Sequence, residues 1–310
     1  MRKMKFCIVA TVATMTLPLA SCHFGHTGGG ADGDSLLYST ITFEDSANAN
    51  GGVAYQQIYV AYPAADVATP LADSIRSWMN GELKTCCYPQ MGDFGVSEVE
   101  PYTGDLRDGE ALVRHYGSQG TAIMGKIMAD GDEDGWIPMG YGNDYHASVL
   151  AQTENYLTYT TGYSIYTGGA HGLYMCEQIT FDRADGRRLG WELVDTLEAR
   201  AELMKCLREG IEEYFNTDVD EDYSNPDENT VKVTLRDVLF AADFNPELSD
   251  DELLSLPGTQ PALTPEGVSF IYQQYEIVAY AYGLPSCTIP YEKAKAFLTP
   301  VGKKLAGVKD

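Results

Sequence analysis

A histidine surrounded by small residues is the first position in this sequence that could do chemistry. His171 lies in the segment YTGGAHG, which begins at Tyr166 and follows a run rich in Tyr and Thr. Gly168 and Gly169 can take positive φ, and Gly172 can do so on the far side, so the backbone can turn sharply there. An imidazole at such a turn can contact a ligand, bind a metal or act as a general base. The alternative is a histidine that hydrogen-bonds to the backbone and locks the turn.

Alternating acids form a second candidate site, for calcium. Asp130, Asp132 and Asp134 stand at positions one, three and five of a calcium-loop pattern, and Gly135 stands at position six. Position twelve is Tyr141, where such a loop requires a bidentate glutamate. Two interpretations therefore stay open: a weak calcium site that stiffens the loop, and a solvated acidic loop.

Asp182 in the segment ITFDRADG is a third candidate. The segment is superficially similar to the TFDDGP motif of polysaccharide deacetylases, in which two adjacent acids serve as base and metal ligand. Arg183 replaces the second acid, and no HxxxH follows to complete a metal site. We expect a strand that runs into a turn. A peptidoglycan-acting hydrolase or deacetylase using His171 and Asp182 is the alternative function.

The elements that would position these side chains are mostly strands. Segments rich in β-branched and aromatic residues predict strands at 36–44, 53–62, 146–152, 155–166 and 173–181, and a last hairpin of 267–271 with 276–282. The SANANGG segment predicts the turn between the first two strands. His171 would then lie in the tight connection between two neighbouring strands.

Helical spacing and capping residues predict fewer helices. Thr69 and Pro70 form a helix start, and the apolar face would comprise Leu71, Ile75, Trp78, Met79 and Leu83. A glycine-broken helical region is expected at 105–128, and a closing helix at 290–298. The pair Asp195 and Glu198 predicts a capped helix to about Phe215, with an apolar face of Leu197, Ala201, Met204, Leu207, Ile211 and Tyr214.

Strand runs interrupted by a few helices favour an α+β fold: two lobes with mainly antiparallel sheets and a few packed helices. We expect an N-terminal α+β module at 36–165 and a C-terminal α+β domain at 166–300.

The N-terminus predicts a lipoprotein. A basic leader, MRKMK, precedes an apolar run of about 15 residues that is too short for a membrane span. The run ends in LASC, which resembles a bacterial lipobox with Cys22 as the lipidated residue. We expect a signal peptide at 1–21 and a lipidated cysteine with a flexible tether at 22–35. His23 follows the anchor where an aspartate would favour inner-membrane retention, so the expected location is the outer membrane of a Gram-negative bacterium, with attachment through lipid only.

The net charge of the chain limits the classes of partner that it can attract. The formal net charge is −24, and the only charged residues of the leader are Arg2, Lys3 and Lys5, so the mature chain carries −27. Such a surface repels nucleic acid and attracts cationic proteins or divalent ions. The alternative is that the acids serve solubility alone.

The cysteines do not form a recognisable framework. Beyond Cys7 and Cys22, five remain: Cys86, Cys87, Cys176, Cys206 and Cys287. Adjacent cysteines rarely bridge each other, and no CxxC is present, so neither a zinc site nor a thioredoxin-type motif is indicated. Buried thiols are expected, with one or two disulfides as an alternative.

Two segments together resemble the RsiV-like ectodomain family, long filed as a domain of unknown function. They are 155–194, which contains YTGGAHG before a strand with an acidic Gly turn, and 263–298. The second contains Tyr275-Glu276-Ile277, then AYxxG at 279–283, then Ile-Pro-Tyr at 289–291. The first half of the chain is similar to the companion N-terminal module, also found ahead of peptidoglycan deacetylase domains.

The resemblance implies a two-lobed α+β fold and a binding function. The best-understood member is an anti-sigma factor whose outer domain binds lysozyme. No second apolar run here is long enough to span a membrane, so sigma-factor signalling is not expected. The expected function is a non-enzymatic envelope lipoprotein without a cofactor that binds peptidoglycan fragments or a cationic protein such as lysozyme. Its ligand-binding candidates are Tyr166, His171, Asp182, Tyr275 and Glu276.

Overall fold

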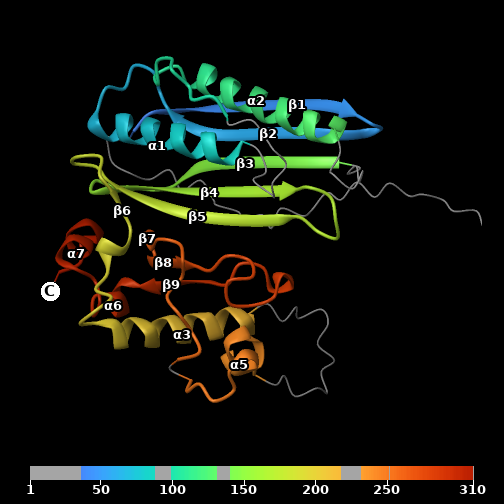
Figure 1. Ribbon diagram of the computed structural model, residues 1–310. Helices are drawn as coiled ribbons and strands as arrows, with labels where there is room; N and C mark the ends of the chain where they lie inside the picture. The colour runs from blue at the N-terminus through green and yellow to red at the C-terminus, as the bar shows by residue number, and fades with distance from the viewer. Residues whose placement is uncertain (1–35, 88–98, 131–139, 218–231, 251, 310) are drawn as a thin grey trace, which may run out of the picture. The chain divides into compact units, whose positions relative to one another are not determined.

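A six-stranded sheet dominates the first part of the protein. The computed structural model describes residues 36–87, 99–130, 140–217, 232–250 and 252–309. The strand order is β1-β2-β3-β4-β5-β6, and every neighbouring pair is antiparallel except the parallel pair β2–β3 (Figure 1). The strands are β1 (Tyr38–Ala49), β2 (Gly52–Pro63), β3 (Gly140–Gln152), β4 (Tyr156–Tyr166), β5 (Leu173–Asp182) and β6 (Arg188–Leu189).

The first hairpin confirms the prediction but is longer than expected. β1 and β2 pair in continuous register from Tyr38 with Pro63 to Ala49 with Gly52. Most of the segment predicted as a turn is therefore strand. Only Asn50 and Gly51 turn the chain, with φ of 50° and 83°, as a two-residue hairpin loop with an Asn-Gly sequence requires.

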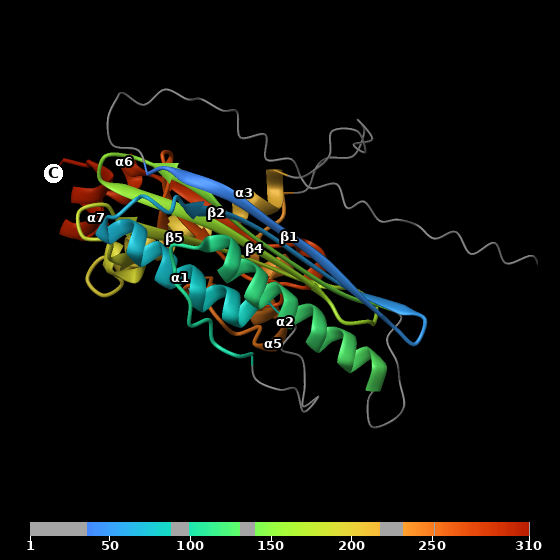
Figure 2. The ribbon, with the colours of Figure 1, turned by 90° about the horizontal axis from the view of Figure 1, so that it is seen from above.

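Two helices cover one face of this sheet. α1 (Pro70–Cys86) and α2 (Gly109–Asp130) run side by side over the strands (Figure 2). The predicted start of α1 is confirmed: the Thr69 side chain accepts a hydrogen bond from the Ala72 N–H at 3.2 Å. The predicted face of α1 is buried at all five positions: Leu71, Ile75, Trp78, Met79 and Leu83.

The glycines of α2 do not break it, which corrects the prediction. α2 begins four residues later than expected and continues without interruption to Asp130. A Cβ on Gly117 would collide with the ring of Phe43, and a Cβ on Gly120 would collide with the carbonyl oxygen of Cys87. These glycines therefore let α2 lie directly on β1 and on the end of α1. The packing gained by this close approach offsets the lower helix propensity of glycine.

The C-terminal part is built on a small antiparallel sheet of β7 (Ala262–Leu263), β8 (Gly267–Ile271) and β9 (Ser286–Pro290). α3 (Arg200–Thr217) packs against β9. The remaining elements are η1 (Trp191–Leu193), α4 (Leu235–Val238), α5 (Phe240–Phe244), η2 (Tyr280–Tyr282), α6 (Tyr291–Ala294) and α7 (Pro300–Ala306).

Three predictions for this part are wrong in detail. The partner of β8 is 286–290, because residues 276–282 form a tight loop that ends in η2. The closing helix ends at Ala294, and α7 begins a separate turn at Pro300 after the Thr299 cap. α3 begins only at Arg200, so Leu197 precedes it and is 86% exposed; Ala201 is also exposed. Asp195 instead accepts the N–H groups of 197 and 198 in the turn before α3.

The architecture confirms the expected α+β fold. A large core lies between the sheet and the two covering helices, and another lies around α3 and the small sheet. Threonine hydroxyls join the two sheets: Thr158 donates to Leu263 O at 2.7 Å, and the Leu263 N–H donates to Thr180 at 2.9 Å. Residues 34–310 form one compact unit, and the large sheet continues across the expected boundary at 165/166. The division into two domains stays a prediction.

The five cysteines that the structure describes are free of disulfides. Cys86, Cys87, Cys176, Cys206 and Cys287 form no disulfide; Cys87 and Cys206 are buried and the others are half-buried. Burial raises the pKa of Cys86 and of Cys287 to about 12 in each case, which makes both thiols poor nucleophiles. Within the described part of the chain, no helix is both long and apolar enough to cross a membrane.

Candidate functional site

The YTGGAHG segment forms the turn between β4 and β5, as predicted. Gly168 and Gly169 adopt φ of 88° and 102°. The Tyr166 hydroxyl donates to the carbonyl oxygen of Gly169 at 3.1 Å and braces the turn. Gly172 keeps an ordinary φ, but a Cβ there would lie 2.7 Å from the Ile165 carbonyl oxygen, so only glycine fits.

Both ring nitrogens of His171 have partners. Nδ1 lies 2.8 Å from the Gly172 carbonyl oxygen, which can only accept, so Nδ1 carries the proton and donates. In the neutral ring Nε2 is then an acceptor, and it lies 2.9 Å from the Tyr275 hydroxyl, which donates. The imidazole is thereby fixed in one tautomer and one orientation.

The ring of His171 stacks on Tyr280. The centroids are 3.9 Å apart and the planes differ by 10°. The ring centroid of Tyr275 lies 6.1 Å from that of His171 and 6.2 Å from that of Tyr280, and the Tyr275 and Tyr280 rings are also stacked. We call His171, Tyr275 and Tyr280 the aromatic cluster. All three are exposed, Tyr275 by 50% and Tyr280 by 37%, and the exposed Tyr166 and Tyr282 lie in the same two loops.

Two glutamines fasten the loop that carries Tyr275 to the edge of the large sheet. β6 pairs only with Thr180 and Phe181, so it leaves the earlier part of the outer edge of β5 uncovered. The Gln273 amide fills that place: its oxygen accepts the Cys176 N–H at 3.1 Å and its nitrogen donates to the Cys176 carbonyl at 2.7 Å. The Gln274 oxygen accepts the Tyr174 N–H at 2.8 Å. Side-chain amides thus replace a neighbouring strand.

The backbone of Tyr275 is strained and held in place by Glu276. Tyr275 has φ of 65°, the left-handed region that is uncommon for a bulky residue. The two carboxylate oxygens of Glu276 accept the N–H groups of Gln273 at 2.7 Å and of Gly258 at 2.6 Å. Strained backbone conformations that are held by surrounding hydrogen bonds are common at functional sites. Here the left-handed conformation of Tyr275 directs its hydroxyl toward His171.

The structure brings together four of the five ligand-binding candidates. Tyr166 and His171 come from the β4–β5 turn, and Tyr275 and Glu276 from the loop after β8. Asp182 does not join them: it ends β5, and the rise of an extended strand places it about 30 Å from the turn. It is buried, and its carboxylate accepts the Ala184 N–H at 2.8 Å. No site using both His171 and Asp182 is formed by this arrangement.

The calcium and lipidation candidates lie mostly beyond the described residues. Cys22, Asp132 and Asp134 are outside them, and Asp130 is the last residue of α2. Among the side chains that the structure describes, no group of three or more His, Cys, Asp or Glu could hold a metal ion.

Sequence reasoning missed Gln273, Gln274 and Tyr280. The signal for the glutamines was their position directly before Tyr275-Glu276 in the segment YQQYEI. Adjacent glutamines in a predicted strand-to-strand connection suggest amides that bond backbone. Tyr280 belongs to the AYxxG motif of the resemblance, but it fell within a segment predicted as strand, where its alternation with Tyr282 looked like a sheet face.

A second group of aromatic and acidic side chains lies on the face of the large sheet away from α1 and α2. We call Tyr55, Tyr59, Asp144 and His146 the strand face; Tyr59 pairs with His146 in register. The His146 ring fills the space that a side chain at Gly162 would need. Burial lowers the pKa of His146, which Asp144 partly offsets, and burial raises the pKa of Asp144, which His146 partly offsets. Burial and the Asp144 charge also raise the pKa of Tyr55.

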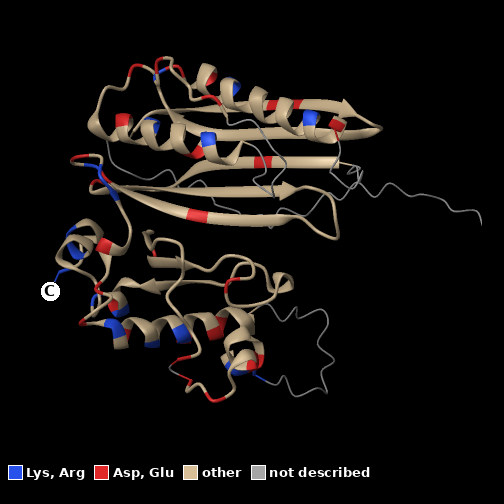
Figure 3. Ribbon diagram, viewed as in Figure 1, with Lys and Arg blue, Asp and Glu red and all other residues tan. Residues whose placement is uncertain are grey.

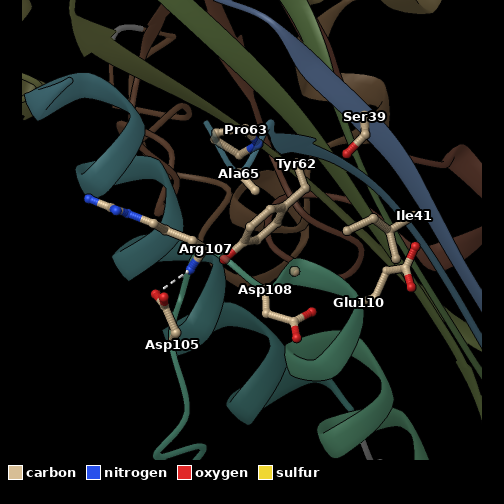
Figure 4. A pocket seen from close by; sticks show the side chains of 10 residues that line it. Ser39, Ile41, Tyr62, Pro63, Ala65, Asp105, Arg107, Asp108 and Glu110 are labelled. Carbon is tan, nitrogen blue, oxygen red and sulfur yellow. Dashed lines mark hydrogen bonds between the residues drawn. The ribbon is translucent and has the colours of Figure 1, made fainter. Parts of the chain in front are cut away.

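A hollow lies at the start of α2. It has a volume of about 520 Å³ and is lined from β1, the end of β2 and residues 105–110 (Figure 4). Three of its polar groups support the fold: Asp105 accepts the Arg107 N–H, Asp108 accepts the Ala111 N–H, and the Tyr62 hydroxyl donates to Leu106 O. Charged positions of both signs lie mainly on helices and loops (Figure 3).

Comparisons with known proteins agree with this fold. Residues 194–292 match the family model described as "Protein of unknown function (DUF3298)". A crystal structure of a DUF3298 family member from Bacteroides fragilis is similar with a TM-score of 0.55 and 21% identity, over 89% of this chain and 98% of that one. A DUF3298 family protein from Pseudomonas aeruginosa gives 0.51 and 16%, over 86% and 96%. At these identities the likeness shows the fold alone. No curated protein matches the chain.

Proposed function

We propose that this protein is a non-enzymatic envelope lipoprotein that binds a cell-wall component or a cationic wall-active protein such as lysozyme, and that the aromatic cluster is its contact surface. One observation carries the proposal: the rings of His171, Tyr275 and Tyr280 are exposed, yet their geometry is fixed by hydrogen bonds and stacking. Rigid exposed aromatics lose little entropy on binding and supply large contact areas.

The hydrogen bonding of the cluster favours contact over catalysis. Both nitrogens of His171 already have partners, and Glu276 uses both carboxylate oxygens to hold the loop. A general base needs an available nitrogen or oxygen within reach of a substrate proton. The alternative function, a peptidoglycan hydrolase or deacetylase using His171 and Asp182, gains no support from their placement, because His171 lies in the turn before β5 and Asp182 lies at the far end of that strand.

The partner class rests on charge and on the resemblance. The net charge of −24 steers cationic proteins toward the surface. The resemblance to the RsiV-like family is a finer assignment than the DUF3298 match, and it supports lysozyme as the cationic protein to test first. Anchoring at Cys22 in an outer membrane completes the proposal. It is supported by the basic leader, the apolar run and the lipobox for the anchor, and by His23 for the membrane.

The test is a calorimetric titration of the protein with lysozyme and with muropeptides, each at two salt concentrations. We expect one of the two to bind in a manner that survives raised salt, since contact with rings is not screened. Tyr280→Leu should then weaken binding by about 2 kcal/mol, the size of an aromatic hot spot.

Tyr59→Leu is the matched control, because Tyr59 is similarly exposed, at 44%, but lies on the strand face. Equal losses in the two variants would show that binding does not use the aromatic cluster. Binding that vanishes with salt would reduce the interaction to charge attraction, and no binding of either ligand would reject the proposal.

A further inference from the structure

The outer edge of β1 carries a ladder of backbone groups that no strand of the described residues uses. β1 is the first strand of the sheet and, within the part of the chain that the structure describes, pairs only with β2, over its full length of 12 residues. The Ala64 N–H donates to Leu37 O at 3.0 Å, which identifies Leu37 and Ala64 as a hydrogen-bonded pair. Such pairs alternate in an antiparallel ladder. The odd-numbered residues of β1 therefore bond to β2, and the even-numbered ones, including Thr40, Thr42 and Glu44, point their N–H and C=O groups outward.

The described residues leave most of this ladder open. Among them, the outward N–H of Ser46 is bonded to the Asp45 side chain at 2.8 Å. No described group bonds to the outward backbone of Thr40 or Thr42. An open edge of this length is a template for another strand, and proteins commonly shorten or cover such edges.

A groove runs along the same edge. A depression of about 270 Å³ is lined by four consecutive strand residues, 40–43, and by Glu110, Val113 and Arg114 of α2. Consecutive strand residues point to opposite faces of a sheet. A depression that contacts all four must therefore follow the backbone edge itself. The hollow of Figure 4 continues it past Ser39 and Ile41 toward the start of α2.

An exposed strand edge beside a helix is the geometry in which extended peptides add a strand: the edge supplies main-chain hydrogen bonds and the helix supplies side-chain contacts. The charged residues that line the groove are Asp105, Asp108 and Glu110 against Arg107 and Arg114. This local acidic excess and the net charge of −24 favour a cationic segment and oppose a second copy of the chain.

We propose that the groove between β1 and α2 binds an extended, positively charged segment of a partner protein by strand addition to residues 39–46. This site is separate from the aromatic cluster. β1 and β5 are four strands apart, about 19 Å at the usual strand spacing.

The test uses a capped peptide of about eight residues, alternating Lys and Thr with Val, long enough to pair with this edge. We expect it to slow amide hydrogen exchange at Thr40 and Thr42. The same peptide N-methylated at every residue keeps its charge but has no backbone N–H to donate on either edge, and should give no protection. Fluorescence anisotropy with labelled peptide measures the affinities.

The diagnostic variant is Thr42→Pro. Because the Thr42 N–H points outward, proline removes no bond to β2, and an edge strand tolerates it. It should weaken peptide binding by at least about tenfold, whereas Thr42→Val, which keeps the amide, should bind within about twofold of the parent. Melting curves check that both variants fold.

Three results would overturn the proposal: no protection by the peptide at millimolar concentration, equal binding of the N-methylated peptide, or a concentration-dependent dimer that Thr42→Pro dissolves. The last would make a second copy the occupant. The N-methylated probe acts on the unaltered protein, so the proposal stays open to rejection even where Thr42→Pro unfolds.

Discussion

The aromatic cluster and the strand face use the same residue types in opposite ways. In the cluster, His171 is exposed, and each ring nitrogen has a hydrogen-bond partner. On the strand face, His146 is half-buried over Gly162, and its neighbour Asp144 interacts with it through charge. The ring of His171 is held in one orientation at the surface. Burial lowers the pKa of His146 and thereby couples its ionisation to folding.

The difference indicates which region should control ligand binding and which should control stability. Removing a ring from the aromatic cluster changes the surface that a partner would contact. Protonating His146 changes the cost of burying it. Perturbations of the cluster should therefore appear chiefly in binding, except where they break its anchors. Perturbations of the strand face should appear in the pH dependence of stability.

The largest effect is expected from the anchor of the cluster. Gln273→Ala removes both bonds to the Cys176 backbone. Two lost hydrogen bonds, with backbone groups left without partners, should lower the free energy of unfolding by about 2 kcal/mol. Chemical denaturation measures this.

Gln274→Ala is the matched comparison, because it removes the single bond to the Tyr174 N–H and should cost about 1 kcal/mol. Equal and negligible losses in both variants would show that the loop does not depend on the edge of β5.

The sequence predicted the parts of the fold that depend on near neighbours. The α1 cap and its buried face follow from Thr69, Pro70 and helical spacing within one segment. The β4–β5 turn follows from its own glycines. The prediction that the glycines interrupt α2 was wrong. These positions require glycine because Phe43 and Cys87 pack against them, and both residues lie outside α2, so the sequence of the helix alone does not reveal the requirement.

The site was only half visible for the same reason. YTGGAHG marked His171 by local composition, but its partner Tyr275 is 104 residues away. Only the resemblance singled out Tyr275. The segment after Tyr275 alternates like a strand, yet the bonds of Glu276 to Gly258 and Gln273 close it into a loop. The alternation of residue types along the segment does not reveal a hydrogen bond to a residue as distant in the sequence as Gly258.

A smaller effect should separate strain from contact within the cluster. Tyr275→Ala and Tyr275→Gly remove the same ring, but only glycine adopts φ of 65° without steric cost. The Gly variant should therefore be more stable than the Ala variant by about 1 kcal/mol. Denaturation of the two proteins side by side measures the difference.

Both Tyr275 variants should lose ligand binding to the same extent, because each lacks the ring and its hydroxyl bond to His171. An Ala variant as stable as the Gly variant would show that the left-handed backbone is not retained without the tyrosine. Retained binding in either would exclude Tyr275 from the contact surface.

The smallest effect belongs to the strand face and is seen only on acidification. Burial lowers the pKa of His146 below its usual 6.5, so the unfolded chain takes up this proton first as the pH falls. The stability that neutral His146 contributes is present above about pH 6.5 and is lost as the pH falls through the lower folded-state pKa. Asp144 has the opposite sign: its raised pKa adds stability as the folded carboxylate takes up a proton, at more acidic pH.

Melting temperatures between pH 7 and pH 5 should therefore fall more in the parent protein than in His146→Gln. Asp144→Asn should steepen the fall, because it removes the charge that favours protonated His146 and also the stabilising protonation of Asp144 itself. Parallel curves for all three proteins would mean that His146 does not couple to folding, and the contrast between the strand face and the aromatic cluster would then rest on exposure alone.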